Sequence, residues 1–136
     1  MKTKMNIIYL VVGILSVLSA FTHTWNGLEN SLKVLNSSGI DGGTKTTLTY
    51  VWHIIGIENI VFGIALIIMA FIKDRDNVKF TVWTIIAVLI TRLVIITVFT
   101  FINGESKIID LLLDSIVMIV VIVLLIFGTR IKNKTI

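Results

Sequence analysis

Four long apolar stretches, each with few charged residues, dominate this chain. They cover residues 5–25, 48–72, 79–102 and 108–127. A stretch of about 20 apolar residues, wound as an α-helix, matches the ~30 Å hydrocarbon core of a bilayer. Because lipid offers the backbone no hydrogen-bond partners, each spanning segment must form a helix. The sequence therefore predicts an all-α fold: one domain, residues 1–136, forming an antiparallel four-helix transmembrane bundle.

The composition agrees with a chain that has almost no water-soluble part. Charged residues make up 15% of the chain, against about 25% in a typical soluble domain. The sequence has no cysteine, which excludes disulfides, thiolate metal sites and cysteine nucleophiles. It also has no proline, so we expect continuous helices rather than the broken helices of many transporters.

Lysine and arginine are distributed unevenly between the two ends of the predicted helices. Eight lie at the termini or around the connection between the second and third stretches, whereas three lie on the opposite side. The positive-inside rule then places both termini in the cytoplasm, in a cell inner membrane. The basic residues flank apolar segments, so the expected partner is the lipid bilayer. They do not form the row of basic and aromatic side chains that is typical of a nucleic-acid-binding surface, so nucleic acid is not expected as a partner.

The first connection, residues 26–47, is the only long one. Leu28, Leu32 and Leu35 follow the i, i+4, i+7 spacing of a helix face. We therefore predict a short amphipathic helix on the outer membrane surface, with a disordered loop as the alternative. The Asp-Gly-Gly run at 41–43 predicts a flexible turn before the second spanning helix.

Seven polar residues within or beside the apolar stretches are the candidate ligand-binding set. They are His23, His53, Glu58, Asn59, Arg92, Asp110 and Asp114. Ionisable groups inside spans are costly and are usually paired or functional. The ionisable members all fall in the predicted outer half of the bundle, which predicts an outward-facing polar pocket for a small polar ligand or ion.

Glu58 and Arg92 are expected to form an ion pair. Each lies about ten residues, or ~15 Å, from the outer end of its predicted helix. Two opposite charges at the same depth on neighbouring antiparallel helices satisfy each other most simply by direct contact. The pair either serves a ligand site or only fixes the packing of the helices; both readings stay open.

Small residues predict where the first two spanning helices pack. In the first helix, Gly13, Ser16 and Ala20 belong to a 4-3-4-3 pattern that runs from Tyr9 to His23. Trp52, Gly56, Asn59 and Gly63 form a similar face on the second helix. Small side chains on such faces allow helix backbones to approach closely.

Several other interpretations of the polar residues remain open. His23 and His53 are conceivable haem or metal ligands, which would make the chain a redox membrane subunit, although no HExxH spacing is present. Asp110 also suits a solvated helix start, where the helix dipole favours a carboxylate. The sequence shows no set of a nucleophile and a base, so we expect a binding or accessory protein rather than an enzyme. The protein is expected to act alone, as a homo-oligomer or within a larger membrane complex.

The run from Gly56 to Leu66, which contains Glu58 and Gly63, resembles the second helix of the DoxX-like small bacterial membrane proteins. In that family a glutamate followed by glycine and an apolar run opens the second helix. The resemblance implies a four-helix membrane fold and covers mainly the first three helices. The arginine that opens the first helix in that family is absent here, so a quinone- or thiosulfate-linked role does not carry over.

Overall fold

The computed structural model describes the backbone of residues 5–74, 76–103 and 108–131, and the side chains of 5–74, 76–102 and 115–131. The described residues form helices and contain no strand. The elements in chain order are α1 (Ile7–Asn26), the π-helical turn η1 (Gly27–Ser31), α2 (Leu32–Ser37), α3 (Gly42–Phe71), α4 (Asp76–Asn103) and α5 (Ile108–Arg130). The all-α prediction is therefore confirmed.

Three described helical segments are long and apolar enough to cross a membrane. They are Ile7–Ser37, Gly42–Phe71 and Asp76–Ile102, and the fourth predicted span is represented by a shorter apolar helical segment, Ser115–Arg130. The first segment is longer than predicted because η1 and α2 continue α1 without a break. In α2, Leu32 is buried, whereas Leu28 in η1 is exposed, so the three predicted leucines do not share one buried face.

The second of the predicted spanning helices begins earlier than predicted. The prediction of a flexible turn at residues 41–43 was wrong, because α3 begins at Gly42 instead of residue 48. The Asp41 side chain caps the helix by accepting hydrogen bonds from the Thr44 backbone N–H at 3.0 Å and the Thr44 hydroxyl at 2.6 Å. An N-cap carboxylate stabilises a helix start, which explains why Gly42 and Gly43 form the first turn of α3.

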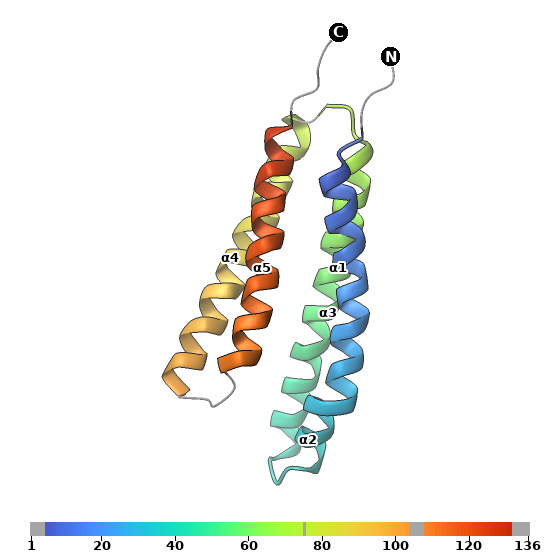
Figure 1. The fold of residues 1–136 in the computed structure, drawn as a ribbon. Coiled ribbons are helices and arrows are strands. Elements are labelled where there is room, and N and C mark those ends of the chain that lie inside the picture. Colours follow the sequence, from blue (N-terminus) through green and yellow to red (C-terminus); the bar gives the residue numbers. More distant parts are fainter. Residues whose placement is uncertain (1–4, 75, 104–107, 132–136) are drawn as a thin grey trace.

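α1 and α3 lie side by side and run in opposite directions (Figure 1). Buried small residues recur every seven positions along both partners. They are Gly13 and Ala20 of α1 with Gly27 of η1, and Gly56, Gly63 and Ala70 of α3. At the closest approach, a Cβ added to Gly13 would lie 2.8 Å from the Gly63 carbonyl oxygen, and one added to Gly63 would lie 2.7 Å from the Gly13 carbonyl oxygen. The predicted close packing of small residues is confirmed here.

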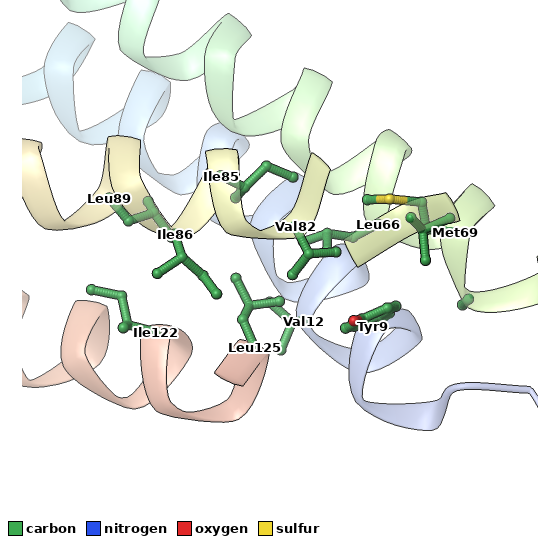
Figure 2. Close-up of a cluster of buried hydrophobic side chains, with 12 residues drawn as sticks. Tyr9, Val12, Leu66, Met69, Val82, Ile85, Ile86, Leu89, Ile122 and Leu125 are labelled. Atoms are coloured by element: carbon green, nitrogen blue, oxygen red, sulfur yellow. The ribbon is translucent and has the colours of Figure 1, made fainter. Parts of the chain in front are cut away.

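The described core lies toward the end of the molecule at which α1 begins and α5 ends, which we call the terminal end (Figure 1). Figure 2 shows Tyr9 and Val12 of α1, Leu66 of α3, Ile86 of α4 and Leu125 of α5 packed there. Toward the opposite end, which we call the loop end, the α4–α5 pair diverges from the α1–α3 pair (Figure 1).

Asn6 ties three helices together at the terminal end. It is only 2% exposed, and its backbone N–H donates to the Ala70 carbonyl of α3 at 2.9 Å. Its side-chain amide donates to the Gly128 carbonyl of α5 at 3.0 Å, and its side-chain oxygen accepts from the Tyr9 N–H at 3.3 Å. A buried polar side chain with all these partners fixes the relative position of the helix ends.

Candidate functional site

Glu58, Asn59 and Arg92 form a polar cluster between α3 and α4. The Arg92 Nη2 atom donates to Glu58 Oε2 in an ion pair, and Arg92 Nη1 donates to Asn59 Oδ1 at 3.1 Å. The predicted contact between Glu58 and Arg92 is thus present. The planar guanidinium suits this arrangement because its fork of donors holds two acceptors at once.

The cluster lies near the middle of both helices. Glu58 is 13 residues before the end of α3 at Phe71, or ~20 Å along the axis, and Arg92 is 11 residues before the end of α4. At that depth in a bilayer a lone charge costs several kcal/mol, whereas a contacting pair is neutral overall. The Glu58 side chain keeps 32% of its surface exposed and the Arg92 side chain 17%, so the carboxylate is the more accessible partner.

His23 lies in a second, separate contact with Trp52. The two rings stack with their centroids 4.5 Å apart and an interplanar angle of 9°. The Trp52 indole N–H donates to the His23 carbonyl at 3.2 Å, and His23 Nε2, in the tautomer that carries the proton there, donates to the Trp52 carbonyl at 3.2 Å. This reciprocal contact joins α1 to α3 at the loop end.

Neither predicted histidine joins the cluster. Within the described residues the His53 side chain forms no hydrogen bond or ion pair. His53 is five residues from Glu58, which places it about 140° around α3. Asp110 and Asp114 lie outside the described side chains. The structure therefore brings together Glu58, Asn59 and Arg92 and leaves His23 and His53 apart from them.

No grouping in the described part of the chain resembles a metal centre. Among those residues, no group of three or more histidine, aspartate or glutamate side chains lies close enough together to hold a metal ion. His23 is already engaged through Nε2, the atom that would face a haem iron, in its contact with the Trp52 carbonyl. The geometry of His23 therefore gives the predicted metal or haem alternatives no support.

Sequence reasoning missed the roles of Asn6 and Trp52. Asn6 directly precedes a long apolar run, which is the position of a helix N-cap, and that signal was available. Trp52 was predicted only to belong to the packing face of the second helix, together with Gly56, Asn59 and Gly63. Its pairing with His23 depends on the register of α1 against α3, which a single sequence does not give.

Comparisons of the chain with protein-family models, curated proteins and solved structures found no match.

Proposed function

We propose that this chain is an integral membrane protein whose Glu58–Asn59–Arg92 cluster binds a small polar ligand or ion within the membrane. In this proposal the four helices cross a cell inner membrane as an antiparallel bundle with both termini in the cytoplasm. The α2 segment then lies at the outer surface. The fold is of the DoxX-like kind that the run from Gly56 to Leu66 resembles.

The observation that carries the proposal is the placement of an accessible carboxylate and a guanidinium at the middle of two apolar helices. Arg92 already holds one side of the Glu58 carboxylate, and Glu58 keeps about a third of its side-chain surface exposed, so the carboxylate remains open to a ligand. Asn59 adds an amide with both donor and acceptor atoms. Together the three side chains offer a polar ligand both kinds of hydrogen-bonding group.

A purely structural role for the pair is the second candidate, because the two charges already satisfy each other. The decisive comparison uses the double variant E58Q/R92M and the charge-swapped variant E58R/R92E. Purified wild type and both variants are heated in detergent with and without a panel of small carboxylates, primary amines and monovalent cations. The melting temperature, Tm, is the readout.

If the cluster is a binding site, at least one compound raises the Tm of the wild type by several degrees and leaves both variants unchanged. A ligand at 100 times its Kd stabilises the folded state by about 2.7 kcal/mol, which is readily detected. If the pair serves packing alone, no compound raises the Tm of the wild type more than that of the variants. The charge-swapped variant is then more stable than the single variants E58R and R92E.

A further inference from the structure

An open groove of about 260 Å³ lies between α2 and the first half of α3, away from the Glu58 cluster. Its apolar lining is formed by Leu32, Leu35, Leu48, Val51, Trp52 and Ile55. The α3 part of the lining runs from Leu48 to Ile55, which is about 10 Å along the helix axis. That length is comparable with one leaflet's share, about 15 Å, of the hydrocarbon core.

A lysine lies at the polar end of this groove. Lys45 precedes Leu48 by one turn of α3, and its ammonium donates to the Asn36 carbonyl at 2.9 Å, next to Leu35. The residue is intermediate in exposure and its hydrogen bond lies at the surface, so the ammonium is anchored at one point and open to a ligand. An ammonium has three donor hydrogens, and the bond to Asn36 uses one of them. The nearby Asp41 carboxylate is hydrogen-bonded to Thr44.

An apolar trough that ends at a fixed cation matches an amphiphile with an acyl chain and an anionic head. We propose that the groove binds an anionic phospholipid, with one acyl chain along the leucine-lined trough and the phosphate on Lys45. This site is distinct from the Glu58–Arg92 cluster and depends only on insertion of the helices into a bilayer. An ordered lipid here would hold α2 against α3.

Trp52 lines the groove and reports directly on its occupant. The full chain with W25F and W83F keeps Trp52 as its only tryptophan, since the sequence has three. This protein is reconstituted in phosphatidylcholine vesicles that contain brominated phosphatidylglycerol or brominated phosphatidylcholine, and Trp52 fluorescence is recorded. A matched variant with W25F and W52F keeps only Trp83 of α4, which lies away from the groove, and reports on membrane insertion.

The expected result is half-maximal quenching of Trp52 at an about fivefold lower mole fraction of brominated phosphatidylglycerol than of brominated phosphatidylcholine. K45Q abolishes this preference, whereas K33Q, which changes an exposed lysine of α2, retains it. V51F narrows the groove and weakens quenching by both lipids. V61F, the same change at an exposed valine further along α3, does not weaken it.

Three results would overturn the proposal. The first is equal quenching of Trp52 by both lipids while Trp83 is quenched, which shows insertion without selectivity. The second is a preference that survives K45Q. The third is self-association that V51F abolishes without any change in Trp52 quenching, which would assign the groove to a second copy of the chain. A cluster without ligand affinity would leave all of these readouts unchanged, so the two proposals fail separately.

Discussion

The contact between Glu58 and Arg92 was predictable because only two opposite charges lie at matching depth in neighbouring apolar stretches. Placing either charge alone in lipid costs more than bringing the helices into register. The wider seven-residue pocket was less predictable, since its closure depends on helix rotation. A rotation of about 100° per residue separates His53 from the cluster although the two are close in sequence.

The energetic coupling of Glu58 and Arg92 can be measured with a double-mutant cycle. We expect E58Q and R92M each to destabilise the fold, because each leaves its former partner unpaired between α3 and α4. The double variant E58Q/R92M should be more stable than the sum of the single effects predicts, with a coupling energy of about 1–3 kcal/mol. Unfolding in mixed detergent and denaturant gives the four free energies. Simple additivity would contradict direct pairing.

Helix boundaries were harder to predict than helix existence. Hydropathy marks where apolar residues begin, but α3 begins at Gly42, where hydropathy gives no signal, because the Asp41 side chain caps it. α2 similarly continues α1 through a π-helical turn that no residue pattern announces. Capping and helix continuation are decided by local hydrogen bonds, which outweigh the preference of Gly42 and Gly43 for turns.

The Asp41 cap predicts a pH-dependent start of α3. Hydrogen bonds from the Thr44 hydroxyl, and next from the Thr44 backbone N–H, hold the pKa of the Asp41 carboxyl below its usual value. A carboxyl with a lowered folded pKa stabilises the fold above its unfolded pKa, and the effect is lost as pH falls through the folded value.

The protection of the Thr44 and Lys45 amides against hydrogen exchange should therefore fall as the pH is lowered from about 5 to below the usual aspartate pKa near 4, after correction for the intrinsic exchange rate. D41N keeps a capping side chain that does not titrate, so its protection should stay flat across the same range. An identical pH response in D41N would exclude Asp41 as the titrating group.

The packing of α1 on α3 predicts opposite outcomes for glycine-to-alanine changes at two positions of α3. Gly63 has the Gly13 carbonyl 2.7 Å from an added Cβ, whereas Gly42 has no atom within 4 Å of one. G63A should destabilise the fold by about 1–3 kcal/mol, because backbone atoms must move apart. G42A should be neutral or stabilising by up to about 1 kcal/mol through helix propensity. Equal effects on thermal unfolding would contradict the close approach.

The four helices share their described apolar core near the terminal end, whereas the Glu58 contact lies near the middle of α3 and the His23 contact lies at the loop end. The sequence indicated this asymmetry through the position of its ionisable residues. The α4–α5 pair diverges from the α1–α3 pair (Figure 1). This divergence was not predictable, because hydropathy measures how well each helix enters lipid and says nothing of how the helices pack on one another.

The orientation of the molecule in the membrane is predicted by its lysine and arginine distribution and can be tested with single cysteines, since the chain has none of its own. G39C lies in the exposed connection before α3, and D74C lies in the exposed connection after it. If the basic terminal end is cytoplasmic, a membrane-impermeant maleimide labels G39C in intact spheroplasts and labels D74C only in inverted vesicles.

The opposite labelling pattern would place the termini outside and would move the Lys45 groove to the cytoplasmic leaflet. Labelling of both positions from one side would mean that α3 does not cross the bilayer. That result would remove the reason for treating the Glu58–Arg92 pair as an intramembrane site, because a partly exposed ion pair in water contributes little and needs no ligand to explain it.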